Sequence, residues 1–557
     1  MASPEVGSSH STLSKARVLA GALIVQLILG TVYGYSIFWQ PLQSQVFPRV
    51  ITEVEKTDLI EQIKRAEAAV TTDEATNPAG VAESLPTLKD ISRYTVVPDE
   101  VAREAQLAKQ NGYLKYAFSI CILAFAFTMV VAGRVQDIKG PRYPAVIGAV
   151  MMGSGFLLAG FMDSPVVFYV AHAAFTGGMA LVALMLFHAL LGKMDPDENP
   201  LAKYMPYAIL TTVIVAGLLI GNNLIGKGSA VDKVMLLWGT IGVLAGSGIG
   251  FAYVCPIAAL VKWFPEHKGL VSGVAVAGFG FGAYLFKGKS TIGALGFIDQ
   301  HGITNFYMVH GLICLVGVSL GAMLLSNPPG SATKKATAGG DSNWQDTLRQ
   351  PSFYLVWLMF FSGAMAGLMV IGILKPFAGE QLVAAAGEVT ATEKAELLAK
   401  GAAAVGWLAI FNAVGRVVWG FVSDRIGRTP AFIAMFTFQA VMMCVLSQMK
   451  SEMALAVAAS VVGFNFGGNF ALFPSATADL FGAKNLGANY GWVFTSYGVA
   501  GVIGVAAGNL AKLHTQSYSA AFILAGILCA ISAGLAIVLS IVIRKHKHPK
   551  VAAPAGD

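Results

Sequence analysis

The sequence predicts an all-α protein that crosses a membrane many times. Of its 557 residues, 55% are hydrophobic and only 12% are charged, and the mean hydropathy is +0.65. This composition is too apolar for a soluble protein of this size. The apolar residues form uninterrupted stretches of roughly 20 residues, the length that an α-helix needs to cross about 30 Å of hydrocarbon. In lipid every backbone N–H and C=O must be bonded within the protein, so apolar runs this long are helices. Their length and lack of alternation exclude a β-barrel.

About fourteen stretches are long enough to span. An even number places both termini on one side of the membrane, and Lys and Arg gather in alternate loops on that side, which predicts a cytoplasmic location for the termini. The expected spans are 17–42, 113–134, 143–162, 165–191, 204–226, 235–261, 268–288, 303–326, 351–376, 402–423, 430–449, 453–475, 486–508 and 517–543.

Composition also argues against several other classes. The net charge of +7 is spread over short loops, which the positive-inside rule explains better than nucleic-acid binding. The five cysteines lie in apolar stretches without metal-ligand spacing, so we expect no metal site. There is no nucleotide-binding P-loop and no nucleophile motif in a soluble segment, so we expect neither an enzyme nor a cofactor.

One motif occurs twice, each time where a spanning helix turns into the next. Gly133-Arg-Val-Gln-Asp137-Ile-Lys-Gly140-Pro-Arg142 recurs as Gly420-Phe-Val-Ser-Asp424-Arg-Ile-Gly427-Arg428, which indicates a duplicated chain. A tight turn favours glycine, and an aspartate at a helix end can bond loop cations and helix N-termini that separate when two halves rock. We therefore interpret these motifs as conformational latches, with candidate residues Gly133, Asp137, Gly140, Arg142, Gly420, Asp424, Gly427 and Arg428.

Six further strings stand beside the repeated motif: Gly30-Thr-Val-Tyr33-Gly-Tyr35-Ser36-Ile-Phe38, Tyr253-Val-Cys-Pro256, Lys262-Trp-Phe-Pro265, Gly278-Phe-Gly-Phe-Gly282, Asn412-Ala-Val-Gly-Arg416 and Gly467-Gly-Asn-Phe-Ala-Leu-Phe-Pro474. With these strings and the repeated motif the sequence resembles the major facilitator superfamily and, within it, the oxalate/formate antiporter family, with a monocarboxylate-transporter-like character. The resemblance implies two six-helix halves around a midplane site. It covers about twelve helices, so 165–191 and 204–226 look like an inserted pair.

The domain organisation follows from this resemblance. We expect an N-terminal helix bundle over 1–326 with an outer insertion at 44–111 and the extra helices within 165–226. A cytoplasmic linker at 327–350 leads to a C-terminal bundle over 351–543, which has an outer insertion at 377–401, and 544–557 form a cytoplasmic tail. Both insertions contain amphipathic helical segments, which suit either a lid, a partner-docking surface or an insertion without a function of its own.

Arg416 is the strongest candidate binding residue, since it lies within an otherwise apolar helix. A central cation in lipid costs roughly 2.5–3.5 kcal/mol or more and needs a partner. Asn412 lies one turn earlier on the same face, so guanidinium and amide together can receive a carboxylate. The alternative is a structural arginine bonded to carbonyls or snorkelling to the membrane edge. The resemblance implies that the matching arginine binds substrate carboxylate.

The resemblance also bears on the substrate. Oxalate-carrying members have a lysine in the helix that matches 486–508, where this chain has Tyr497. A second carboxylate without a cation would cost several kcal/mol in a low-dielectric site, so we expect a monocarboxylate. Similar members that carry lactate-like substrates have a tyrosine matching Tyr253. Tyr33 and Tyr35 lie in a helix that lines the cavity in this superfamily, and a phenol can donate to a carboxylate.

We therefore expect a secondary transporter of a small organic carboxylate, such as lactate, formate or acetate, working by alternating access in the cytoplasmic membrane as a monomer. Either a proton or a counter-anion is the coupling partner. No spanning helix has a central Asp or Glu to serve as a proton relay, and the exchange of one anion for another needs no titrating side chain. His172, His188 and His310 lie in apolar stretches and are candidates for titration. The alternatives are an oxalate/formate-type exchanger, a drug or solute exporter of the same superfamily, and an anion-sensing receptor.

Overall fold

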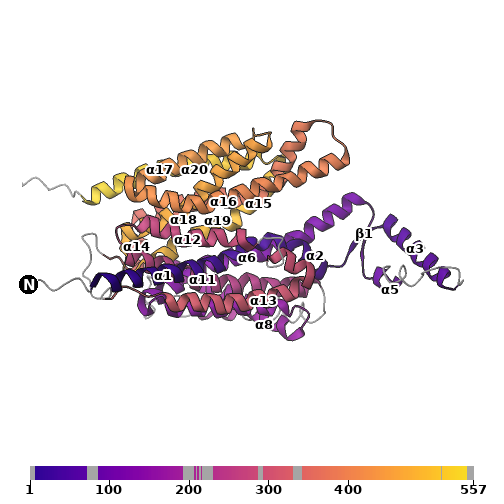
Figure 1. Cartoon of the computed structure of the whole chain (residues 1–557), viewed down its shortest axis with the longest axis horizontal. Coiled ribbons are helices and arrows are strands. Elements are labelled where there is room, and N and C mark those ends of the chain that lie inside the picture. Colours follow the sequence, from indigo (N-terminus) through magenta and orange to yellow (C-terminus); the bar gives the residue numbers. More distant parts are fainter. Residues whose placement is uncertain are drawn as a thin grey trace, which may run out of the picture.

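The computed structural model describes residues 7–71, 86–191, 206–208, 210–212, 215, 230–286, 293–329, 341–515 and 517–547. Long helices run side by side along the molecule (Figure 1). Within these residues, eleven helices are long and apolar enough to cross a membrane, and Lys268–Gly282 is a shorter apolar helix. The prediction of an all-α polytopic protein is therefore confirmed. The predicted span 204–226 lies almost wholly outside the described residues.

The first group of helices extends from α1 to α13. Its first span bends from an α-helix into a 3₁₀ helix, η1, and its fourth span contains a π-helical turn, η2. The elements are α1 (Gly7–Leu29), η1 (Gly30–Phe38), α2 (Trp39–Val46), α6 (Glu100–Lys139), α7 (Arg142–Gly160), α8 (Pro165–Leu191), α10 (Ala230–Leu237), η2 (Trp238–Ala245), α11 (Gly246–Trp263), α12 (Lys268–Phe286) and α13 (Ala294–Leu324).

The second group follows residue 341. Inside it α16 packs against α18, α15 against α19, and α17 against α20. The elements are α14 (Trp344–Arg349), α15 (Pro351–Ala386), α16 (Ala391–Ile426), α17 (Arg428–Leu446), α18 (Glu452–Phe481), α19 (Leu486–Thr515) and α20 (Ser519–Lys547).

A small subdomain lies between α2 and α6. Strands β1 (Val50–Thr52) and β2 (Thr95–Val97) pair in parallel beside α3 (Glu53–Thr71) and α5 (Leu88–Ile91), so two short strands interrupt the expected all-α chain. Ile51, Ile63 and Ile91 form its apolar core. In α5, hydrogen bonds from Thr87 hold the pKa of Asp90 below its ordinary value, because they favour the ionised carboxylate.

Two ends of the molecule are distinguishable in Figure 1. We name the end where α1 begins and α20 ends the terminal end, and the end that carries β1, α3 and α5 the insertion end. Two seams join the groups between these ends: α6 packs against α19, and α12 packs against α16. α6 starts at Glu100, well before the predicted residue 113, because Asp99 caps a polar extension of the helix at the insertion end.

Candidate functional site

Arg416 lies at the α12–α16 seam, and none of its surface is exposed. Its Nε donates to Oδ1 of Asn412 at 2.9 Å, one turn earlier on α16. Its Nη1 donates across the seam to the Val276 carbonyl of α12 at 2.6 Å. Two of the three guanidinium nitrogens are therefore bonded, and one bond ties the two helix groups together.

The third nitrogen, Nη2, is buried and has no hydrogen-bond partner among the described residues. No described carboxylate pairs with Arg416 either. Its charge is partly balanced by two aromatic faces, with ring centroids 4.4 Å (Phe470) and 5.8 Å (Phe279) from the guanidinium carbon. Cation–π contacts of this kind are worth about 0.5–2 kcal/mol, which is less than the several kcal/mol needed to bury an ion. The site therefore still lacks a full negative counterpart.

Glycines allow the backbones to approach around Arg416. A Cβ on Gly273 of α12 would stand 2.1 Å from the Arg416 carbonyl oxygen, and one on Gly467 of α18 would stand 2.0 Å from that of Asn412. Both distances are far below van der Waals contact, so only glycine permits this packing. These contacts hold the guanidinium at a fixed position between three helices.

Four tyrosine hydroxyls surround the guanidinium closely enough to interact with its charge: those of Tyr33, Tyr253, Tyr490 and Tyr497. The Tyr33 hydroxyl on η1 hydrogen-bonds to that of Tyr497 on α19, across the two groups. The Tyr253 and Tyr490 hydroxyls lie near each other, and both are buried without an aligned hydrogen bond. The cluster thus offers one cation and several phenol donors within a shell of phenylalanine rings.

Tyr35 lies elsewhere. Its ring stacks on Phe118 and meets Phe38 edge to face, and its hydroxyl lies in the core of the first group. Residues two apart point to different sides of an α-helix and of a 3₁₀ helix alike, so Tyr33 and Tyr35 point in different directions. Of the five residues predicted to bind together with Arg416, four lie around it and Tyr35 does not. Tyr490, which the sequence analysis missed, also lies in this cluster.

The candidate latch at Asp137 lies at the terminal end of the α6–α19 seam. Its carboxylate accepts from the backbone N–H of Gly487 at 3.1 Å and of Ala488 at 2.8 Å, in the first turn of α19. Nζ of Lys262 lies 3.6 Å from the same carboxylate. The aspartate of one group therefore caps a helix N-terminus of the other, where the helix dipole favours negative charge.

Asp424 makes the corresponding contact on the other seam. It accepts from the N–H groups of Gly269 and Leu270, at 2.9 and 2.8 Å, in the first turn of α12. Arg428 pairs with Asp424 at 2.8 Å and also with Asp479 at 2.8 Å. Lys268, from the first group, binds the same Asp479 at 2.7 Å. This latch is therefore a network of four charged side chains.

The two motif glycines inside the helices allow these latches to close. A Cβ on Gly133 would stand 2.0 Å from the Gly487 carbonyl oxygen, and one on Gly420 would stand 2.3 Å from that of Gly269. The helices therefore touch backbone to backbone beside each aspartate.

The remaining motif residues serve the turns. Gly140 and Gly427 have φ of 83° and 92°, a region that glycine adopts without strain. Arg142 donates from Nε to the Leu325 carbonyl at 2.6 Å, within the first group. Unlike Arg428, it does not contact its aspartate among the described residues.

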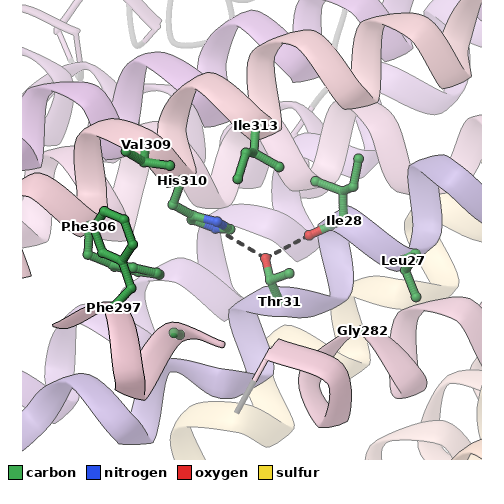
Figure 2. A pocket seen from close by; sticks show the side chains of 10 residues that line it. Leu27, Ile28, Thr31, Gly282, Phe297, Phe306, Val309, His310 and Ile313 are labelled. Carbon is green, nitrogen blue, oxygen red and sulfur yellow. Dashed lines mark hydrogen bonds between the residues drawn. The ribbon is translucent and has the colours of Figure 1, made fainter. Parts of the chain in front are cut away.

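A separate pocket of about 250 Å³ lies between α1, η1, α12 and α13. Figure 2 shows Thr31 and His310 facing each other across it, 3.2 Å apart, with Phe297, Phe306 and Val309 around them. None of the described residues that line it is charged. Val309 and Ile313 are exposed beside it, so this pocket opens to the outside of the helix bundle and lacks a cation for a carboxylate.

Comparisons with known proteins agree with this architecture. The Major Facilitator Superfamily profile matches residues 394–556. An oxalate:formate antiporter of Oxalobacter formigenes is 30% identical over 311 residues, 55% of this chain and 70% of that protein. The uncharacterized MFS-type transporter YhjX of Escherichia coli (strain K12) is 28% identical over 62% of this chain and 79% of that protein. Monocarboxylate transporter 12 of Xenopus laevis is 24% identical over 63% of this chain and 79% of that protein.

A solved structure gives the same fold. The proton:xylose symporter XylE bound to 6-bromo-6-deoxy-D-glucose superposes with a TM-score of 0.53, at 12% identity and over 96% of both chains. The antiporter match, the paired seams and the apolar spans lead to one assignment: the chain belongs to the major facilitator superfamily of membrane transporters.

Proposed function

We propose that the chain is a secondary carrier that moves a small organic monocarboxylate, with its carboxylate bound at Arg416. One observation carries the proposal: among the described residues, Nη2 of a fully buried guanidinium makes no well-aligned hydrogen bond, and the guanidinium lies among phenol hydroxyls, that of Tyr33 near enough to interact with it. Arginine binds a carboxylate through two parallel N–H donors. Asn412 and the Val276 carbonyl hold the guanidinium plane, while the tyrosines supply further donors to the anion.

The number of cations favours a monocarboxylate. Arg416 is the one fully buried cation in the described part of the chain, and Tyr497 stands beside it. A second carboxylate at this position would be buried without a counter-charge, at a cost of several kcal/mol. Phe125, Phe279 and Phe494 enclose the tyrosines, which suits a short alkyl chain. We propose lactate, formate or acetate as the class to test first.

Alternating access follows from the two seams. The proposed halves are residues 1–326 and 351–543, joined by the linker at 327–350, and they rock about the Arg416 site. Asp137 and Asp424 close the terminal end by capping helices of the opposite half. Opening that end breaks both caps and exposes the site to the other compartment. We further propose that the terminal end is cytoplasmic, that the membrane is the inner membrane and that the carrier is a monomer.

Coupling to a counter-anion needs no titrating side chain, whereas a proton symporter needs a group that binds a proton in step with the substrate. An oxalate/formate-type exchanger is therefore the second candidate, and the 30% identity to the oxalate:formate antiporter favours it. Oxalate–formate counterflow would distinguish it from a monocarboxylate carrier. In our proposal oxalate is the poorer substrate, because it has two negative charges for one buried arginine.

Counterflow of labelled lactate, formate and oxalate in proteoliposomes tests the proposal. Arg416→Lys keeps the charge but loses the two-pronged donor geometry, so we expect it to abolish lactate counterflow. Arg425→Lys is the matched control, since Arg425 is exposed near the end of the same helix, and it should transport like the parent. Parental transport by Arg416→Lys would show that Arg416 does not clamp the carboxylate.

A further inference from the structure

Besides the Arg416 site, two hydrogen-bond donors, the Lys115 ammonium and the Trp39 indole N–H, lie next to each other closer to the insertion end. Nζ of Lys115, on α6, stands 4.8 Å from the ring centroid of Trp39, at the start of α2. No described carboxylate lies within ion-pair distance of this ammonium. The Trp39 indole N–H is buried and has no acceptor among the described residues. Two adjacent groups that only donate, one of them positively charged, fit an anion.

Lys115 lies on the face of α6 that packs against α19, at the seam between the two groups. Lys115 precedes Ile122 by seven residues, which is about two turns of helix and the same face. Ile122 contacts α19 at Gly501, where a Cβ would stand 2.8 Å from the Ile122 side chain. Lys115 therefore continues the α6–α19 seam beyond this contact, on the side away from the latches.

Aromatic contacts connect this position to the Arg416 site. Phe118, one turn after Lys115, has its ring centroid 6.1 Å from that of Tyr35 and 6.5 Å from that of Tyr33. Tyr33 in turn bonds to Tyr497 across the two groups. Phe118 and Tyr33 therefore link the turn of α6 that carries Lys115 to the Arg416 site.

We propose that Lys115 and Trp39 form a capture subsite, which binds the substrate carboxylate at the insertion end before it passes between Tyr33 and Tyr497 to Arg416. The inference rests on the proposed carboxylate transport. The ammonium and the indole N–H bind one carboxylate, and the Tyr33–Tyr497 bond opens to let it through. If Lys115 had only a structural role, its cation–π contact would hold α2 against α6. Removing Lys115 would then change the KM equally for substrate supplied from either side.

Lys115→Gln tests the subsite, with Lys109→Gln as the control, because Lys109 is exposed on the same helix. We expect Lys115→Gln to raise the KM for lactate supplied from the insertion end about tenfold, with kcat within about twofold of the parent. The KM for lactate supplied from the terminal end should be unchanged. Lys109→Gln should behave like the parent from both sides. Equal KM values for Lys115→Gln and the parent at the insertion end would overturn the subsite.

Two further variants separate capture from packing. Lys115→Arg keeps a cation and should restore most of the KM, whereas Trp39→Phe keeps a ring but removes the N–H and should raise the KM about threefold. Raising the ionic strength should weaken uptake by the parent more than by Lys115→Gln. A KM that rises equally from both sides would show a structural role and reject capture. A different result would reject the proposed carboxylate site at Arg416: Arg416→Lys would then transport like the parent.

Discussion

The two seams between the helix groups share one design and differ in one position. Aligning Gly133 with Gly420 places Met129 of α6 at the position of Arg416 on α16, four residues before the glycine in each case. Both helices meet their partner backbone to backbone at the glycine. Among the described residues of the two seams, the one fully buried cation is Arg416, on the α12–α16 seam. The two copies of the motif thus make corresponding contacts, and the buried charge lies on one seam.

The candidate latch on the α12–α16 seam has more and closer ion pairs than the one on the α6–α19 seam. Asp424 pairs with Arg428 at 2.8 Å, and that arginine also binds Asp479. Among the described residues, the one cation paired with Asp137 is Lys262, at 3.6 Å. The seam that holds Arg416 thus also has the larger charge network at the terminal end. We infer that the α12–α16 latch contributes more to keeping that end closed.

Among changes that compare the two seams, filling the glycine contacts should have the largest effect. Gly133→Ala and Gly420→Ala each place a methyl group 2.0–2.3 Å from a carbonyl oxygen of the opposite group. Overpacking costs about 1–3 kcal/mol, so we expect transport to fall by up to about a hundredfold. Initial rates of counterflow measure this. Gly406→Ala on α16, which has nothing within 4 Å, should leave the rate unchanged; an equal loss there would point to general instability.

The second-largest effect is expected from neutralising the latch carboxylates, which compares the two seams directly. Asp137→Asn and Asp424→Asn remove charge-assisted bonds to helix N-termini, each worth about 1.5–3 kcal/mol. Both variants should therefore populate a state that is open at the terminal end, about tenfold more often than the parent. Asp424→Asn should have the larger effect, because Arg428 loses a carboxylate at 2.8 Å whereas Lys262 stands 3.6 Å from Asp137. Distances between spin labels placed on the two groups would report the population, and a larger effect of Asp137→Asn would contradict the ranking of the two latches.

The smallest effect concerns the tyrosines. Tyr497→Phe removes the hydroxyl bonded to Tyr33 and adjacent to Arg416, at about 1 kcal/mol for one neutral hydrogen bond. Lactate affinity should fall about fivefold. Tyr35→Phe is the control, because its hydroxyl lies away from the cluster, and we expect less than a twofold change. Equal losses in both variants would show that Tyr35 also contacts substrate.

Apolar length and the repeated motif were enough to predict the helices and the turn positions. They could not predict the polar extension of α6 from Glu100, since a helix outside lipid needs no apolar run and is stabilised by its Asp99 cap. The strands β1 and β2 escaped notice for a similar reason. Each has three residues, and they pair only because the chain between them folds back.

Within the site, sequence pattern identified the charge but not all its neighbours. Arg416 and Asn412 are four residues apart on one helix, so their contact follows from helix geometry. Three features of the site were not predicted: the direction of Tyr35, the place of Tyr490 and the acceptor at Val276. Tyr35 follows Tyr33 by two residues, and on an α-helix or a 3₁₀ helix that spacing turns the two side chains to different sides. The Val276 carbonyl is a backbone acceptor contributed by another helix, and no residue type marks it.

Ligand-dependent thermal stability of the purified carrier tests the central claim most directly. A ligand at 100 times its Kd stabilises the folded state by about 2.7 kcal/mol, so the unfolding temperature of the parent should rise with lactate concentration. Arg416→Lys should show no such rise, while Arg425→Lys should match the parent. An equal rise in Arg416→Lys and the parent would contradict a carboxylate site built on the Arg416 guanidinium.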